Sequence, residues 1–441
     1  MRLIRNKLLT LHRFAVLTAV ATLALVSLGG LVTSHGVGMA VPDWPNTYGY
    51  NMFFFPISQW VGGIFYEHTH RLLASTVGLL TSILALWLYG TKARLFMRWT
   101  GLVLITLAIA TIIGVPKHAA DAFVLALTGL GLTGASFVWP QCEPAPKWLC
   151  RLGLAAFFAV VLQGVLGGLR VVWIKDQIGI FHAALAQLFF ALTCSIALFT
   201  SRWWSEGNEA NPKAEPGIRI SDLLIPFGTF LILCQLILGA TMRHQHAGLA
   251  IPDFPLAYGK LWPATDPASV TLYNQQRLEV VDANPITAFQ ITLQMLHRLL
   301  AVLILVAVAC CAWVSRKTPS VVSYRTDGDS TKAVTKWGAK QVSALTLGWF
   351  ILILAQGFLG AATIWTNKAA DIATAHVVVG ALSLALGTLI SIISLRSAVP
   401  HLSAQISRDV EPVPIHSTRI APRPSVRSEI PEPVSRLLNP R

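Results

Sequence analysis

Four histidines recur at matching places in two parts of this sequence, and imidazole is a side chain that can ligate a metal. His70 and His297 each open a copy of the pentapeptide HRLLA. His182 and His376 each lie near the start of an apolar stretch that follows a QGVLGG or QGFLGA motif. A single histidine at a helix end is commonly an interfacial residue. Four equivalent ones indicate a function, because ionisable groups within membrane spans usually face the bundle interior.

The number of repeated histidines predicts the kind of metal site. Two imidazoles from facing helices suit the two axial positions of a haem iron. Zinc and copper sites usually use three or four nitrogen, sulfur or oxygen ligands, and neither part repeats a cysteine beside its two histidines. We therefore expect iron ligation by His70 with His182, and by His297 with His376.

An arginine directly follows the first histidine of each pair, at Arg71 and Arg298. A guanidinium group beside a haem edge is well shaped to pair with a propionate carboxylate. The alternative is that both arginines anchor their helices at the membrane interface.

The two parts differ at one position that matters for chemistry. Glu67 lies three residues before His70 and shares its helical face, whereas Gln294 stands three residues before His297. A carboxylate beside a reacting group can accept a proton or stabilise a cationic intermediate, which an amide cannot do. The alternative is a solvated interfacial glutamate. This asymmetry predicts a catalytic half and an electron-handling half.

The remaining histidines carry less weight. His68 has no counterpart in the second part, and we treat it as secondary. His35, His244 and His246 do not align with one another, which indicates loop or surface residues rather than ligands.

The motifs around the histidines favour close packing and ordered loops. The glycines of QGVLGG and QGFLGA let a flat ring or a neighbouring helix approach the backbone. The loops VPDWPNTYG and IPDFPLAYG suit an ordered lid over the outer mouth. We expect Asp43 and Asp253 in these loops to cap a short helix, with other polar contacts as the alternative.

The composition identifies an integral membrane protein. Of the 441 residues, 54% are hydrophobic and 12% charged, and the mean hydropathy is +0.60. A soluble domain of this composition would expose large apolar patches. Apolar runs near the roughly 20 residues needed to cross a bilayer predict about ten helices. The predicted spans are 13–33, 66–89, 97–115, 120–139, 152–173, 179–200, 221–241, 288–314, 342–363 and 371–396.

The basic residues predict the orientation. The net charge of +14 is not gathered into a groove-sized patch, so we expect no nucleic-acid partner. Residues 34–70 contain no Lys or Arg, whereas basic residues precede the first span and follow the second. The positive-inside rule then places both termini in the cytoplasm. No predicted outer loop contains any of the six cysteines, so we expect reduced thiols.

An internal repeat organises the spans. Residues 29–49 align without gaps to 239–259, with 8 of 21 positions identical, and both copies are followed by HRLLA, QGxLG and a histidine in the same order. The fold class that we predict is an all-α polytopic membrane protein. It contains two pseudo-symmetric four-helix bundles, related as a parallel repeat, plus an inserted helical hairpin. The predicted units are an N-terminal half (1–220, with the hairpin at 97–139), a C-terminal half (221–396) and a disordered cytoplasmic tail (397–441).

Together these motifs resemble the haem A synthase family over about residues 14–396, apart from the hairpin. The resemblance rests on EHTHR (family form E-x-x-H-R), the PDWP loop, QGxLGG and the later single histidine. It implies an oxidoreductase that oxidises a methyl group of haem O to a formyl group, giving haem A for terminal oxidases. It also implies that His70 and His182 face the substrate haem, that His297 and His376 ligate haem B, and that Glu67 is the catalytic carboxylate.

The sequence departs from that family in the outer loops. Many members carry a cysteine immediately before PDWP, where Val41 and Ile251 stand here. A thiol redox role in these loops is therefore excluded.

The partners of the protein and the functions that compete with this one stay open. We expect the protein to lie in a lipid bilayer. Haem O synthase, a membrane electron donor and a second copy of the chain are possible partners, and the sequence assigns no residues to these contacts. The N-terminus lacks a transit-like leader, which favours the bacterial cytoplasmic (inner) membrane. The rival functions are a di-haem electron-transfer cytochrome b and a parallel-repeat transporter.

Overall fold

The computed structural model describes residues 2–206, 220–276, 285–317, 322–327, 330–335 and 339–398. Within these ranges, ten helices are long and apolar enough to cross a membrane, as the sequence predicts. They are α1 (Arg2–Ser34), α2 (Gly62–Leu88), α3 (Ala93–Gly114), α4 (Ala119–Val138), α5 (Lys147–Trp173), α6 (Asp176–Phe199), α8 (Ile220–His244), α10 (Ala288–Lys317), α11 (Ala339–Trp365) and α12 (Ala370–Ala398).

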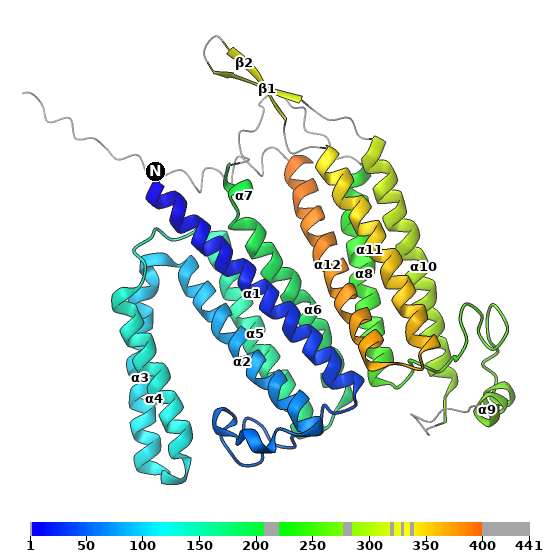
Figure 1. Cartoon of the computed structure of the whole chain (residues 1–441), viewed down its shortest axis with the longest axis horizontal. Helices are drawn as coiled ribbons and strands as arrows, with labels where there is room; N and C mark the ends of the chain where they lie inside the picture. Colours follow the sequence, from blue (N-terminus) through cyan, green and yellow to red (C-terminus); the bar gives the residue numbers. More distant parts are fainter. Residues whose placement is uncertain are drawn as a thin grey trace, which may run out of the picture.

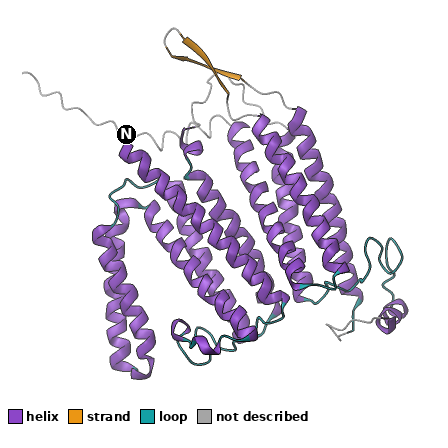
Figure 2. Cartoon of the chain, viewed as in Figure 1, coloured by secondary structure: helices purple, strands orange, loops and turns teal. Residues whose placement is uncertain are grey.

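Eight of these helices pack as two groups of four. Helices α1, α2, α5 and α6 contact one another in a ring, and α8, α10, α11 and α12 form a second ring. The rings meet where α1 and α6 contact α12 and where α6 contacts α8. Figures 1 and 2 show the two groups side by side.

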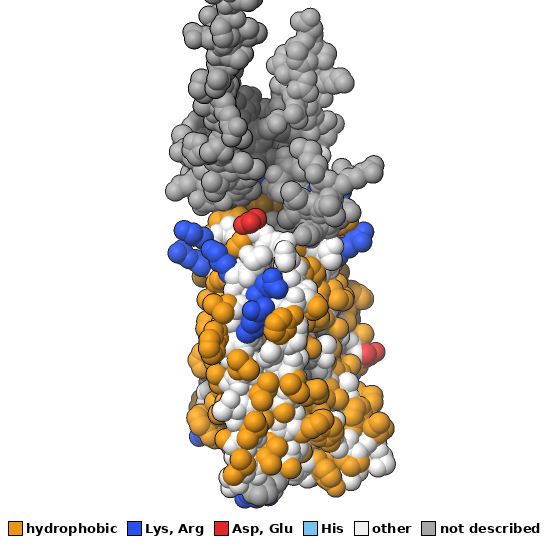
Figure 3. Space-filling view, turned by 90° about the vertical axis from the view of Figure 1, so that its left-hand side faces the viewer, with side chains coloured by type: hydrophobic (Ala, Val, Ile, Leu, Met, Phe, Trp, Pro, Cys, Tyr) orange, Lys and Arg blue, Asp and Glu red, His pale blue; other side chains and the backbone are white. Residues whose placement is uncertain are grey.

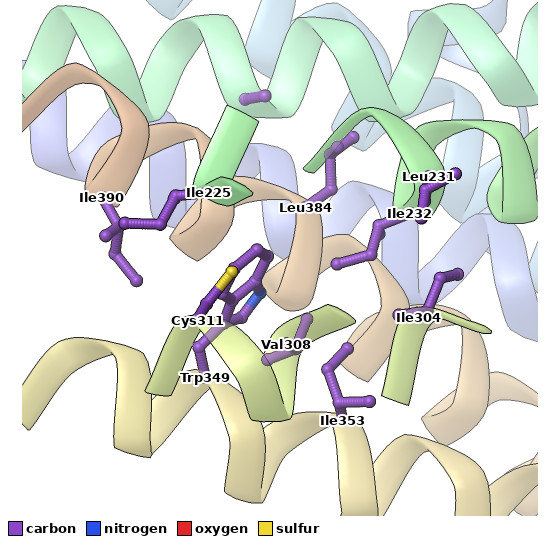
Figure 4. Packing of buried hydrophobic residues seen from close by; sticks show 11 residues of the cluster. Ile225, Leu231, Ile232, Ile304, Val308, Cys311, Trp349, Ile353, Leu384 and Ile390 are labelled. Carbon is purple, nitrogen blue, oxygen red and sulfur yellow. The ribbon is translucent and has the colours of Figure 1, made fainter. Parts of the chain in front are cut away.

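A cluster of buried apolar side chains holds each ring together. In the second ring, Trp349 of α11 is fully buried between Ile225 of α8, Val308 of α10 and Ile390 of α12 (Figure 4). The Trp349 indole N–H donates to Ser383 O at 2.9 Å, which satisfies its only polar atom. Because lipid tails are as apolar as these side chains, close packing rather than removal from water stabilises such clusters.

The predicted hairpin insertion is formed by α3 and α4, which pack mainly on each other. Small residues allow the close approach: a Cβ added at Gly101 would lie 2.6 Å from Gly129 O. Near the start of α4 the hairpin is bonded to the loop that precedes α2, where Asn51 Nδ2 donates to Asp121 Oδ1 at 2.8 Å. The side of the molecule that α3 and α4 form is rich in hydrophobic side chains, as a lipid-facing surface requires (Figures 1 and 3).

The structure adds elements that the sequence analysis did not predict. The chain is not entirely α-helical, because strands β1 (Val322–Asp327) and β2 (Ser330–Thr335) pair as an antiparallel hairpin. Short helices α7 (Arg202–Glu206) and α9 (Pro267–Gln276) lie in loops. The predicted disordered tail lies, from residue 399 onward, outside the described residues.

Helix α2 begins at Gly62 and not at residue 66, so Glu67 and His70 are already inside a regular helix. The loops that precede α2 and α10 lie at the same end of the molecule, opposite the start of α1 and the β1–β2 hairpin (Figure 1). This arrangement brings both copies of the Pro-Asp loop over the ends of the helices that carry the histidines.

Candidate functional site

The four repeated histidines lie on four different helices, each with its ring against a glycine of a neighbouring helix. A Cβ added at these glycines would lie 3.1–3.3 Å from the imidazole Cε1, closer than most Cβ contacts in proteins. The facing pairs are Gly29 with His70, Gly167 with His182, Gly239 with His297, and Gly360 with His376. Only the absence of a side chain at the glycine lets each ring reach this depth in the bundle.

The histidines come together in the predicted pairs. His70 of α2 and His182 of α6 are close enough to interact electrostatically, and so are His297 of α10 and His376 of α12. The structure therefore brings the two imidazoles of each half together within one helical ring.

One nitrogen of every imidazole is buried without a partner. The Nδ1 atoms of all four rings have no hydrogen-bond partner among the described residues. In His70, His182 and His297 this leaves Nε2 as the nitrogen that a ligand can reach, while His376 Nε2 has Gln356 Nε2 at 3.5 Å. Within the described residues no group of three or more His, Cys, Asp or Glu side chains is arranged to hold a metal ion. Two imidazoles from facing helices are a donor set that suits haem iron.

Two glutamines fix the backbone beside the histidines. Gln163 Nε2 donates to His182 O at 3.0 Å, and Gln235 Nε2 donates to His297 O at 2.9 Å. Each glutamine thus links its own helix to the backbone of the helix that carries the histidine. This bond fixes the position of the two helices at the histidine.

Glu67 is buried and hydrogen-bonded to the loop that precedes α2. Its Oε2 accepts a hydrogen bond from Val41 N at 2.9 Å, and its Oε1 forms a 2.7 Å ion pair with Arg71 Nη2. Gln294 is equally buried, and its Oε1 accepts from Ile251 N at 2.7 Å. The two side chains thus make the same contact with their loops, and the negative charge is what distinguishes the first half.

Arg71 and Arg298 bind loop carbonyls. The two Nη atoms of Arg71 donate to Val41 O, Asp43 O and Asn46 O at 2.7–2.9 Å, in addition to the ion pair with Glu67. Together these contacts use the four terminal N–H groups of Arg71. Pairing of Arg71 with a propionate would require it to release one of them.

Arg298 donates less extensively, with Nη1 to Leu256 O at 2.9 Å and Nη2 to Asp253 O at 2.7 Å. Its buried Nε has no partner among the described residues. Arg298 therefore keeps donors that a ligand could take up.

The aspartates of the two loops close turns. The preferred alternative, that Asp43 and Asp253 cap a short helix, is wrong, and the other alternative, polar contacts, is confirmed. Each carboxylate accepts backbone N–H groups five and six residues later at 2.7–2.9 Å. The donors are Tyr48 and Gly49 in the first loop and Tyr258 and Gly259 in the second, all with positive φ. A carboxylate can accept two donors at once, which holds this unusual backbone conformation in place.

The secondary histidines take up structural positions. His68 is fully buried under the first loop, where its Nδ1 lies 3.2 Å from Thr47 Oγ1 and its ring contacts Trp60 and Phe55. His244 lies at a helix end and is half-buried. It ends α8 and packs on Gly179 of α6, with Nε2 2.7 Å from where a Cβ would stand.

Sequence reasoning missed Arg170, which reaches the first histidine pair from α5. Its guanidinium interacts electrostatically with His70, His182 and Glu67. The signal that would have found it is the alignment of the QGxLG motifs, which sets Arg170 against Thr363 and so reveals a second charge confined to the first half.

Comparisons with known proteins show the family of the chain. The profile of the COX15-CtaA family, described as cytochrome oxidase assembly protein, matches residues 12–388. Curated relatives named heme A synthase include one from Symbiobacterium thermophilum, 34% identical over 147 residues, and one from Methylobacterium radiotolerans, 27% identical over 244 residues. These alignments cover 32% and 54% of this chain.

The aligned parts span 46% and 58% of those two relatives, about half of their length. A longer match is to a heme A synthase from Geobacillus kaustophilus, 24% identical over 378 residues, which covers 83% of this chain and 86% of that protein.

Proposed function

This chain belongs to the COX15-CtaA family of cytochrome oxidase assembly proteins, and from this premise we propose that it is a haem A synthase. The proposed reaction is the oxidation of a methyl group of haem O to the formyl group of haem A. The observation that supports it most strongly is the combination of two matching histidine pairs with a buried carboxylate beside only one of them.

The residues present fit haem in both halves. Each half offers two imidazoles from facing helices, with a buried Nδ1 that lacks a partner and a glycine cradle that a single Cβ would fill. His70 and His182 would hold the substrate haem, and His297 and His376 would hold haem B. When bound, the iron supplies the redox chemistry.

The side chains of the first half would position the substrate and move protons. Glu67 stands one turn from His70 and is held in place by Val41 N and Arg71. A carboxylate fixed at this place can accept a proton from the reacting edge of the substrate or stabilise a positive charge there. The loop that Glu67 and Arg71 hold over the helix ends would exclude water from the outer mouth.

The equivalent contacts of the two halves support a duplicated architecture. In this proposal α1, α2, α5 and α6 form one four-helix bundle, and α8, α10, α11 and α12 form its parallel repeat, with the α3–α4 hairpin as an insertion. In this proposal the termini lie in the cytoplasm and the Pro-Asp loops lie outside a bacterial inner membrane, which the distribution of basic residues supports. Haem O synthase, a membrane electron donor and a second copy of the chain are candidate partners.

A di-haem electron-transfer cytochrome is the second candidate, since the two histidine pairs are held in the same way. Electron transfer alone needs no carboxylate in one half, so the difference between Glu67 and Gln294 favours the synthase.

The test is extraction and chromatography of haem from the purified protein after co-expression with a source of haem O. We expect haem A in the extract together with haem B. Haem B alone would leave the electron-transfer cytochrome as the better description, and a protein without haem would refute the ligand assignment.

A further inference from the structure

Arg170 is a charged side chain of the first half that the proposed reaction does not yet use. It stands three residues after Gly167, the glycine that packs on His182, and its counterpart in the second half is the uncharged Thr363. Residues three apart share a helix face, so Arg170 extends from the same side of α5 that meets the histidine pair.

The guanidinium of Arg170 is held in position without being hydrogen-bonded. Its Nη1 and Nη2 atoms lie 3.2 Å from the position that a Cβ would take on Gly38, so the guanidinium packs against the loop that precedes α2. It is half-buried, yet it donates no hydrogen bond and forms no ion pair with any residue that the structure describes. A half-buried guanidinium without an acceptor keeps all of its N–H donors available to a ligand.

The charges around Arg170 leave room for an anion. Glu67 and Asp176 are its acidic neighbours, and Arg243 of α8 is also within electrostatic reach. Glu67 is already paired with Arg71. The three guanidiniums of Arg71, Arg170 and Arg243 thus face two carboxylates, and a further carboxylate would balance the excess positive charge.

We propose that Arg170 binds a propionate carboxylate of the haem that is held between His70 and His182. This assignment rests on the proposed function, because it takes that haem to be the ligand of the first histidine pair. A guanidinium fork binds a carboxylate through two parallel hydrogen bonds, which fixes the rotation of the porphyrin about the axis through the two imidazoles. Arg170 would thus choose which edge of the macrocycle faces Glu67, and Thr363 leaves the second half without this control.

The test measures binding rather than turnover. The full-length protein is titrated with ferric haem B and, separately, with its dimethyl ester, in which both propionates are esterified. The Soret absorbance is recorded for the wild type, Arg170→Gln, Arg170→Lys and Arg170→Thr. The same titrations are repeated with His70→Ala added to each protein. The absorbance change that this substitution abolishes is assigned to haem bound in the first half. Arg151→Gln, at the exposed inner end of the same helix, is the matched control.

We expect Arg170→Gln and Arg170→Thr to weaken haem B binding in the first half by roughly tenfold or more, the loss typical of a charge-assisted hydrogen bond. Arg170→Lys should lose less, and the dimethyl ester should bind the wild type and the variants equally. Arg151→Gln should match the wild type for both probes. Haem bound in the second half reports that each variant is folded.

Unchanged haem B affinity in Arg170→Gln, or equal weakening of both probes, would overturn the assignment. A wild-type first half that takes up neither probe would overturn it together with the haem-binding part of the proposed function. A wild type that binds haem B through Arg170 but never yields haem A would refute the synthase and leave this assignment intact.

Discussion

Glu67 and Gln294 occupy equivalent positions and accept the same backbone hydrogen bond, from Val41 N at 2.9 Å and from Ile251 N at 2.7 Å. Both residues bonded at the main chain immediately precede a Pro-Asp dipeptide. The protein therefore shows within one chain that an amide can replace the carboxylate in holding the loop. Glu67→Gln would keep an acceptor for Val41 N and remove only the charge that pairs with Arg71.

Glu67→Gln should consequently leave the loop and haem binding intact while abolishing most haem A formation. If the carboxylate acts as a proton acceptor, its loss should lower the rate by about 10²- to 10⁴-fold. The measurement is the ratio of haem A to haem O in extracts, beside the Soret spectrum as a control for haem content. A variant that still makes haem A at the wild-type rate would reduce Glu67 to an anchor.

Much of the architecture could be predicted from the sequence because membrane spans are set by length and apolarity. The ten helices follow from these two properties. The pairing of His70 with His182, and of His297 with His376, was predicted from the repeat, and the structure brings the same rings together.

The contacts made by loops and helix ends could not be predicted in the same way. The packing of His244 could not be predicted because it depends on Gly179, which lies 65 residues earlier and outside any repeated motif. The role of Asp43 depends on positive φ at Tyr48 and Gly49, which composition does not reveal. The commitment of Arg71 to loop carbonyls likewise depends on the folded path of residues 41–46.

The glycine cradle offers a test with a control in the same motif. Gly167→Ala would place a Cβ 3.3 Å from His182 Cε1, whereas a Cβ at Gly164 meets nothing within 4 Å. We expect Gly167→Ala to push the imidazole away and reduce haem occupancy of the first half by several-fold. Gly164→Ala should be neutral, or stabilising by up to about 1 kcal/mol through helix propensity.

The second half repeats this comparison with Gly360, where the Cβ position lies 3.2 Å from His376 Cε1, and Gly357, where it meets nothing. Haem content of the purified variants, measured as the pyridine haemochrome, checks both pairs. Equal haem loss in Gly164→Ala and Gly167→Ala would show that the ring contact is not the cause.

The two histidine pairs should lose haem independently. His182→Ala removes one imidazole of the first pair, and His376→Ala removes one of the second, while each leaves the other ring of helices unchanged. Each variant should therefore lose the low-spin haem signal of its own histidine pair and keep the signal of the other pair. Loss of both haems from either variant, in protein that remains monodisperse on size exclusion, would mean that the sites are not separate.

The last prediction concerns Arg71 and the stability of the loop that precedes α2. Its four terminal N–H groups join Val41, Asp43, Asn46 and Glu67, and a lysine ammonium offers only three donors from a single point. Charge-assisted hydrogen bonds contribute about 1.5–3 kcal/mol each, so Arg71→Lys should weaken loop anchoring by at least ~2 kcal/mol. Limited proteolysis of residues 35–61 should then be faster than in the wild type and in Arg298→Lys, where Nη atoms contribute only two such bonds. Equal cleavage rates in the three proteins would show that the loop is held by its aspartate turn and aromatic packing rather than by Arg71.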